Sequence, residues 1–211
     1  MEAHEIAEQI HENSEPHAHA EPGPDWFRRL TAIYVGVAAM LLAIAALGGA
    51  DATKEMLNAN IHASDTYAFY QAKYIRQLQY QTAAEQLELA AAGAPGLSPE
   101  RLAKVAETVK FYRDTAARYE SEPPKKPGKV GKGKKELLDT AHEWEEKRDH
   151  AEAQTPNFEY AEALLQIAIV LGSVAIVAAS PTLLGVSGVL AFGGILLTLN
   201  GYLLLVPLGH G

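Results

Sequence analysis

The stretch TAIYVGVAAMLLAIAALGGA, residues 31–50, decides how this chain folds, because it is apolar and carries no charge. A helix needs about 20 such residues, at about 1.5 Å each, to cross a hydrocarbon core of roughly 30 Å. Two further uncharged apolar stretches follow at residues 163–179 and 182–206. With their flanking residues included, the sequence predicts three transmembrane helices, at 26–50, 161–179 and 182–208.

Charge is segregated along the 211 residues. All 18 Lys and Arg residues lie between Arg28 and Arg148, and Glu162 is the last charged residue of either sign. A water-soluble domain would not leave so long a C-terminal run without charge. The absence of cysteine excludes disulfides and thiolate metal sites, and the formal net charge of −8 argues against a nucleic-acid partner.

The N-terminal residues 1–25 are acidic and rich in Ala, His and Pro, which predicts a disordered tail. Trp26 and Phe27 followed by Arg28 and Arg29 are typical of the membrane–water interface. The apolar run behind them is longer than a signal-peptide core and begins after about 30 residues, so we expect a retained anchor.

The orientation of the chain in the membrane is weakly determined. Arg28 and Arg29 before the first span favour an inside N-terminus, which would place residues 51–160 in the periplasm. Lys54, Lys147 and Arg148 flank the spans on the other side and favour the reverse. We prefer the periplasmic placement by a small margin, and the cytoplasmic one stays open.

Residues 51–160 are predicted to form an extramembrane helical segment. No proline interrupts residues 51–92, so the first span should continue into a rod of about 60 residues, with Gly48 and Gly49 as the place where it could bend. A weak heptad seam runs along this helix. It comprises Ile61, Ala68, Ile75, Thr82 and Leu89, interleaved with Ser64, Gln71, Leu78 and Glu85.

A second helix should begin at Ser98, an N-cap residue, with Pro99 in the first helical position. Its apolar residues recur every three or four positions, which predicts that it packs against the long helix as a hairpin. They are Leu102, Val105, Val109, Tyr112, Ala116 and Tyr119.

The lysine-rich residues 123–135 predict a flexible loop. The helix is expected to resume at residues 136–154 and to break or kink at Thr155–Asn157 because of Pro156. Ser180 and Pro181 should turn the chain at once between the last two spans. The predicted fold is therefore an all-α membrane protein, with a helical hairpin or coiled coil between the first and second of three transmembrane helices.

No catalytic motif is found, and the uncharged stretches 31–50, 163–179 and 182–206 lack the Asp, Glu, Lys, Arg and His residues that membrane enzymes and transporters use. The sequence therefore predicts no catalytic residue, no cofactor and no metal site. The polar and aromatic cluster just beyond the first span is instead a candidate helix-packing or partner surface. Its residues are Asn58, Asn60, His62, Asp65, Tyr67, Tyr70 and Tyr74. Tyr80 continues this aromatic patch along the helix, and Tyr112 and Tyr119 are the expected packing partners of its four tyrosines.

The stretch AIYVGVAAMLLAIAALGGADATKEMLNANIHASDTYAFYQAKYIRQ, residues 32–77, resembles an uncharacterised bacterial membrane family known as domain of unknown function 4337. The run NANIHASD at residues 58–65 is the most specific part of the resemblance. The resemblance implies a multi-pass protein of the bacterial inner membrane with three spans, and it brings no activity or site residue with it.

These observations favour a non-enzymatic structural, assembly or accessory protein that acts through helix–helix association. Its expected partners are the lipid bilayer and either further copies of itself or another membrane protein. A ligand-sensing helical bundle that signals through a partner is the main alternative, and a small transporter or channel component is a weaker one.

Overall fold

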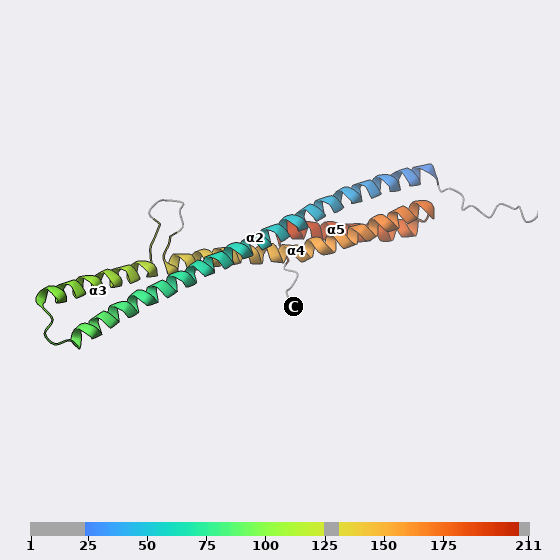
Figure 1. Ribbon diagram of the computed structural model, residues 1–211. Coiled ribbons are helices and arrows are strands. Elements are labelled where there is room, and N and C mark those ends of the chain that lie inside the picture. Colours follow the sequence, from blue (N-terminus) through green and yellow to red (C-terminus); the bar gives the residue numbers. More distant parts are fainter. Residues whose placement is uncertain (1–23, 125–130, 207–211) are drawn as a thin grey trace, which may run out of the picture. The chain divides into compact units, whose positions relative to one another are not determined.

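A computed structural model of the chain describes residues 24–124 and 131–206, and these residues fold into four helices (Figure 1). The helices are α2 (Asp25–Ala92), α3 (Pro99–Glu120), α4 (Lys134–Val177) and α5 (Pro181–Leu203). No strand occurs in this part of the chain. The expected all-α class is confirmed for the described residues. Residues 1–23 of the acidic tail expected at 1–25, and residues 125–130 of the lysine-rich loop, lie outside them, and Asp25 begins α2.

The helix boundaries follow local sequence signals. At α3, the backbone N–H of Arg101 donates to Ser98 Oγ at 3.4 Å, and Pro99 occupies the first helical position, as expected. At α5, the backbone N–H of Leu183 donates to Ser180 Oγ at 3.5 Å. The turn before it holds Ala179 at a φ of 46°, a conformation that L residues rarely adopt.

The long helix α2 runs for 68 residues without interruption, so the prediction of one continuous rod is confirmed. Helix α4 likewise runs for 44 residues straight through Pro156. Of the two outcomes expected at residues 155–157, the break is therefore wrong, and the kink stays a prediction. Proline removes one backbone N–H, but a long helix tolerates this loss when the helix is packed on both sides of it.

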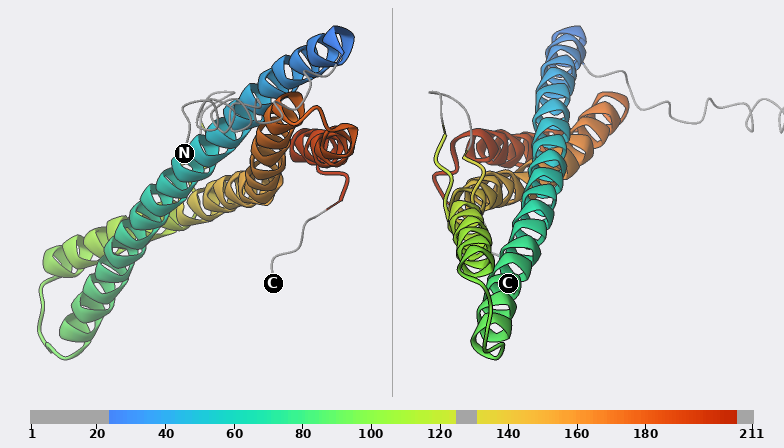
Figure 2. Two further views of the ribbon diagram at one scale, coloured as in Figure 1. Left: turned by 90° about the vertical axis from the view of Figure 1, so that its right-hand side faces the viewer. Right: turned by 60° about the vertical axis from the view of Figure 1, so that its left-hand side comes forward.

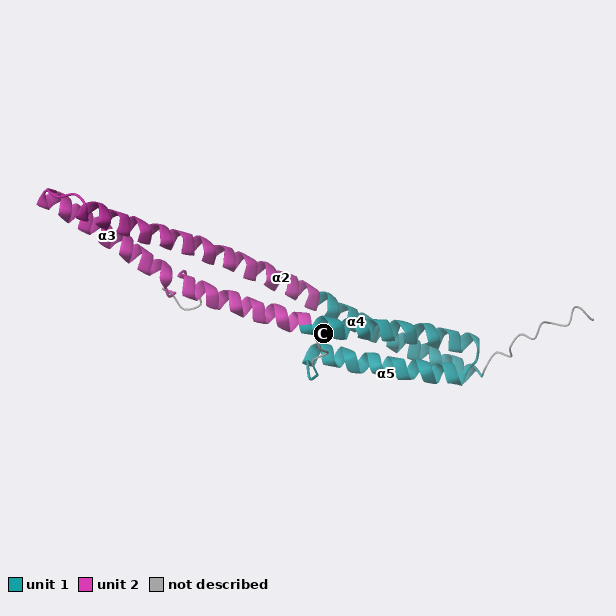
Figure 3. Ribbon diagram, turned by 90° about the horizontal axis from the view of Figure 1, so that it is seen from below, with its two compact units in different colours: residues 1–51, 153–211 teal, residues 52–152 magenta. Residues whose placement is uncertain are grey.

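The chain divides into two compact units, residues 1–51 with 153–211 and residues 52–152 (Figure 3). Unit 1 contains the three apolar stretches, carried by α2, α4 and α5, that are long and apolar enough to cross a membrane. Its core forms where these helices meet, around Leu165 and several small residues. The buried cluster consists of Ala45, Ala161, Leu165, Ala168 and Ala191.

Unit 2 is a helical hairpin extended by the first turns of α4 (Figure 2). Helix α3 packs back along the end of α2, as the apolar stripe of α3 predicted: Tyr80 on α2 contacts Tyr112 and Tyr119 on α3, with ring centroids 5.5 and 5.8 Å apart. Buried residues on the facing stripe of α3 include Val109 and Ala116.

The buried face of α2 in unit 2 is the opposite of the predicted seam. Ala52, Ala59, Ala63, Gln77 and Ala84 are buried. In contrast, all nine residues of the predicted heptad seam are exposed within this chain. The seam therefore pairs with no other helix in the described part of the chain. The contact inside the chain is made mainly by alanines instead, because a side chain of one carbon lets two helices approach closely.

Candidate functional site

The candidate surface on α2 is split by the structure between contacts with α4 and open surface. Asn58, Asn60 and Asp65 are exposed. The His62 ring stacks on the Trp144 ring of α4, with centroids 4.5 Å apart and planes at 20°. The ammonium of Lys147 lies 4.3 Å from the centroid of the Trp144 ring. These contacts join α2 and α4 through aromatic and cationic groups.

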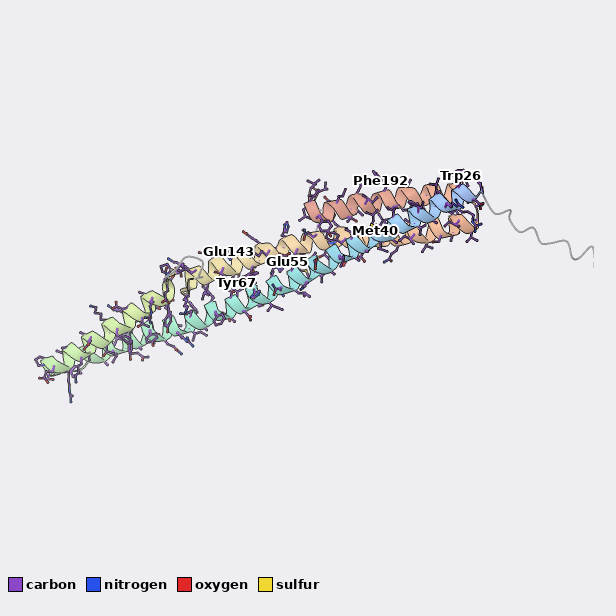
Figure 4. The ribbon with its side chains drawn as sticks, turned by 90° about the horizontal axis from the view of Figure 1, so that it is seen from above. Trp26, Met40, Glu55, Tyr67, Glu143 and Phe192 are labelled. Carbon is purple, nitrogen blue, oxygen red and sulfur yellow. The ribbon has the colours of Figure 1, made fainter. Side chains whose placement is uncertain are left out.

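Of the four tyrosines expected to pack against α3, Tyr80 does so, whereas Tyr67 and Tyr74 contact α4. Tyr67 is half-buried and faces the beginning of α4 (Figure 4), where partial burial and a hydrogen bond to the Glu145 carboxylate raise its pKa. Tyr74 lies beneath the ammonium of Lys134, 5.0 Å from the ring centroid. Tyr70 is half-buried. The contacts of Tyr112 and Tyr119 are made with Tyr80 and, for Tyr119, with Lys73.

The sequence reasoning missed a buried polar junction where α2, α3 and α4 come together. Gln77 Nε2 donates to the backbone carbonyl of Ala116 at 3.2 Å and to the Glu120 carboxylate at 3.0 Å. Glu120 also pairs with the Lys134 ammonium at 2.9 Å. The hydrogen bond from Lys134 and, to a smaller extent, the one from Gln77 lower the pKa of Glu120. One buried glutamine in a row of small residues is the signal that could have identified this junction.

Glu136, in the first turn of α4, connects α4 to the residues that follow α3 beside this junction. Ser121 Oγ donates to one of its carboxylate oxygens at 2.5 Å, and the backbone N–H of Glu122 donates to the other at 3.1 Å. Partial burial alone would raise the pKa of Glu136. The hydrogen bonds from Ser121 and from backbone N–H groups outweigh that effect and lower the pKa.

The lowered pKa values of Glu120 and Glu136 predict that unit 2 loses stability in mild acid. A folded-state pKa below the unfolded value means that the carboxylate stabilises the fold above the unfolded pKa. That stabilisation should disappear as the pH falls through the folded pKa, below about 4.5. We expect the midpoint temperature of thermal unfolding of the full chain to decrease when the pH is lowered from 6 to 3.5. This decrease should be smaller in Glu136→Gln than in the wild type.

Thermal unfolding followed by circular dichroism measures this pH dependence. The exposed Glu107 on α3 supplies the control, because Glu107→Gln should keep the wild-type dependence. Identical pH profiles for Glu136→Gln and the wild type would refute the role of this carboxylate.

In unit 1, a hydrogen-bonded chain links all three apolar helices. Ser187 Oγ on α5 donates to the backbone carbonyl of Ala168 on α4 at 2.5 Å. A serine hydroxyl has one proton, so the Tyr34 hydroxyl on α2 is the donor in its 2.8 Å contact with Ser187 Oγ. Gly172 makes room for this contact, since a Cβ there would lie 3.2 Å from the Tyr34 ring.

Replacing Ser187 by alanine should destabilise unit 1 by about 0.5–2 kcal/mol, because the Tyr34 hydroxyl and the Ala168 carbonyl both lose their partner in an apolar setting. Reversible unfolding in mixed detergent micelles measures the change. Ser173→Ala is the matched control, since exposed Ser173 bonds only to the Ile169 carbonyl of its own helix. Equal stabilities of the two variants would rule out a structural role for the Tyr34–Ser187 link.

A second polar link holds the end of α5 against α4. Asn200 Nδ2 donates to Asn157 Oδ1 at 2.6 Å and to the backbone carbonyl of Val206, while Asn200 Oδ1 accepts from the Val206 N–H. Asn157 is fully buried. Asn200 is one of two amides near the ends of the apolar stretches, for which the sequence predicts either helix packing or hydration at the interface. The other, Gln166, is exposed.

Comparison with known proteins identifies a family but no function. Among the described residues, no group of three His, Asp or Glu side chains is placed to hold a metal ion. Searches of curated proteins and of solved structures gave no match. The family described as domain of unknown function (DUF4337) matches residues 27–204, from the start of α2 to the end of α5. The chain therefore belongs to the DUF4337 family, and the resemblance of residues 32–77 is confirmed.

Proposed function

We propose that the protein is a non-enzymatic integral protein of the bacterial inner membrane, acting as an assembly or accessory factor through helix–helix association. The observation that carries this proposal is a contrast between two groups of glycines in unit 1. In the first group, side chains of the same chain occupy the space where a Cβ would project. This group comprises Gly48, Gly172, Gly194 and Gly201. Gly36 on α2, with Gly185 and Gly188 on α5, face open space.

Open glycines on apolar helices suit contacts with another membrane helix. Inside a bilayer there is little hydrophobic drive between helices, so association depends on close packing at small residues. The polar groups of unit 1 support the same function. Tyr34, Ser187, Asn157 and Asn200 are engaged in the hydrogen bonds described above. The apolar stretches contain no Asp, Glu, Lys, Arg or His. Transport of an ion or proton usually needs such residues.

Reconstitution of the full chain in liposomes tests this function. The chain lacks cysteine, so a single label can be placed at Glu55→Cys on an exposed position of α2. Energy transfer between labelled copies should persist as lipid is added, and Gly36→Leu together with Gly188→Leu should weaken it. Transfer that falls to the level of random collision on dilution would overturn self-assembly. Ion flux above that of empty liposomes would favour a transporter instead.

A ligand-sensing bundle is the second candidate, and one observation favours it. A surface hollow in unit 2 combines three phenol rings with a guanidinium and an amide. It is lined by Arg76, Gln79, Tyr80, Ala83, Tyr112 and Tyr119. A small ligand of this hollow should raise the thermal midpoint of the full chain, and Tyr80→Ala should abolish that rise. A screen of small molecules by thermal shift decides between the two candidates.

A further inference from the structure

The exposed face of α2 in unit 2 carries a heptad pattern that none of residues 24–124 and 131–206 covers. Large apolar residues on it are strongly exposed, including Ile61 at 59%, Leu78 at 51% and Leu89 at 73%. With Ile61 assigned to position a, the a positions are Ile61, Ala68, Ile75, Thr82 and Leu89. The d positions are then Leu57, Ser64, Gln71, Leu78, Glu85 and Ala92, and all eleven residues are exposed.

This exposed stripe lies opposite the face that α2 uses within the chain. A helix advances by about 100° per residue, so Leu57 and Ile61, two residues on either side of buried Ala59, both lie about 160° from it. The partner helix of the same chain therefore leaves the stripe accessible along its whole length. Contact on one face does not compete with contact on the other.

The exposed stripe is also straight. The buried face repeats every seven residues, through Ala52, Ala59 and half-buried Thr66, Lys73 and Tyr80. A helix that keeps a seven-residue repeat against its neighbours is wound at 3.5 residues per turn. The opposite stripe then stays in line from residue 57 to residue 92, about 50 Å, and offers a seam to a helix of the same period.

The residues of the seam suit two parallel strands. β-branched Ile61 and Ile75 occupy a positions and Leu57 and Leu78 occupy d positions, the combination that favours parallel dimers. The flanking e and g positions hold the candidate surface residues Asn58, Asn60, Asp65, Tyr67 and Tyr74. In a parallel pair Asn60 faces Asp65, and Tyr74 faces Gln79, so no like charges meet there. The polar Ser64, Gln71 and Glu85 at d reduce stability, Glu85 most of all because its carboxylate faces its own copy, and the buried amide of Gln71 fixes the register.

We propose that the stripe binds a second copy of this chain, giving a parallel, in-register coiled coil of two α2 helices. This inference rests on the proposed membrane anchoring, because two copies inserted in the same orientation present α2 in parallel. A strip about 50 Å long and about 10 Å wide covers roughly 500 Å² per chain, near the lower limit for a stable interface. Anchoring in one bilayer raises the effective concentration enough to favour the pair.

Cysteine cross-linking of the full chain in liposomes tests the pairing. In a parallel, in-register pair, identical a or d positions face each other within reach of a disulfide. Ser64→Cys, Ala68→Cys and Thr82→Cys should each form disulfide-linked dimers under mild oxidation. An antiparallel pair could link at most one of them. Ala90→Cys, an exposed alanine off the stripe, should link poorly and is the matched control for Ala68→Cys.

A charge at position 75, in the centre of the stripe, should weaken the pair much more than the same charge placed beside the stripe. In the Ser64→Cys chain, Ile75→Lys should lower the cross-linked fraction by roughly tenfold or more, because position a is buried in a coiled coil. Phe69→Lys also replaces an exposed apolar residue of α2, at position b, and should have little effect. Cross-linking that does not exceed that of Ala90→Cys, or that survives Ile75→Lys, would overturn the proposal.

The two proposals fail differently. If energy transfer persists on dilution with lipid but the stripe cysteines do not link, association through the glycine faces stands and the α2 pairing is wrong. If energy transfer is also lost on dilution, self-assembly and the α2 pairing both fail. Cross-linking at the three stripe positions together with persistent transfer supports both.

Discussion

Replacing Phe158 by alanine is expected to lower the free energy of unfolding of unit 1 by about 3–5 kcal/mol, the usual cost of emptying a buried aromatic site. Phe158 is 1% exposed and packs edge-to-face on Tyr202, with ring centroids 4.9 Å apart. Glycines surround its ring: a Cβ at Gly48 or at Gly201 would lie 2.5 or 2.8 Å from it. Neither glycine can fill the space left by the ring. Detergent-micelle unfolding monitored by circular dichroism measures the loss.

Phe192 supplies the control for this substitution. It lies on the outer surface of α5 (Figure 4) and is 61% exposed, so Phe192→Ala should change stability by less than about 1 kcal/mol. A double-mutant cycle sharpens the test, because Gly48→Ala should cost more in the wild-type chain than in a chain that already carries Phe158→Ala. Equal effects of Phe158→Ala and Phe192→Ala would show that the packing of the Phe158 ring against Gly48 and Gly201 does not stabilise unit 1.

Local signals in the sequence were sufficient to locate the helices. Ser98 with Pro99, and Ser180 with Pro181, each combine a capping side chain with a proline that needs no N–H, and each pair begins a helix in the structure. The continuous rod followed from the absence of proline between residues 51 and 92. These signals act within a few residues, so they can be read without knowing what the helix packs against.

The packed faces of the helices could not be located in the same way. Ile61 and Leu89 carry the stronger apolar signal, yet Ala59 and Ala63 are the buried residues of α2. Alanine favours helix formation everywhere, so its presence does not mark a face. Gly48 and Gly49 were interpreted as a bend, whereas the structure uses them to admit Phe158 and Glu162 from α4. That role depends on residues more than a hundred positions away.

The candidate surface was predicted in outline and not in its contacts. The sequence grouped His62 with Tyr67 and Tyr74 because they are close along one helix. Their partners Trp144, Glu145 and Lys134 lie on α4, and only the tertiary fold brings them near. Asn58, Asn60 and Asp65 stay exposed beside the heptad stripe. Pairing of the heptad seam within or between chains was open from the sequence; because the described residues of its own chain leave the seam exposed, pairing between chains remains the prediction.

Unit 2 should be sensitive to any increase in size along its alanine face. Ala59 is 1% exposed on α2, and Ala141 on α4 is fully buried. We expect Ala59→Leu to destabilise unit 2 by about 1–3 kcal/mol, because a larger side chain would force the helices apart. Alanine and leucine have similar helix propensities, so the change reports packing and not helix formation. Thermal unfolding of the full chain followed by circular dichroism measures it.

Ala72→Leu on the same helix separates packing from other effects of leucine. Ala72 is exposed, so its replacement should change stability by less than about 0.5 kcal/mol. If Ala59→Leu proved as stable as Ala72→Leu, α2 would have room at Ala59 and the close approach of its alanine face would be wrong. A selective loss at Ala59 would instead establish that α2 commits its alanine face to its own chain. The heptad stripe would then be the face of α2 left for a second copy.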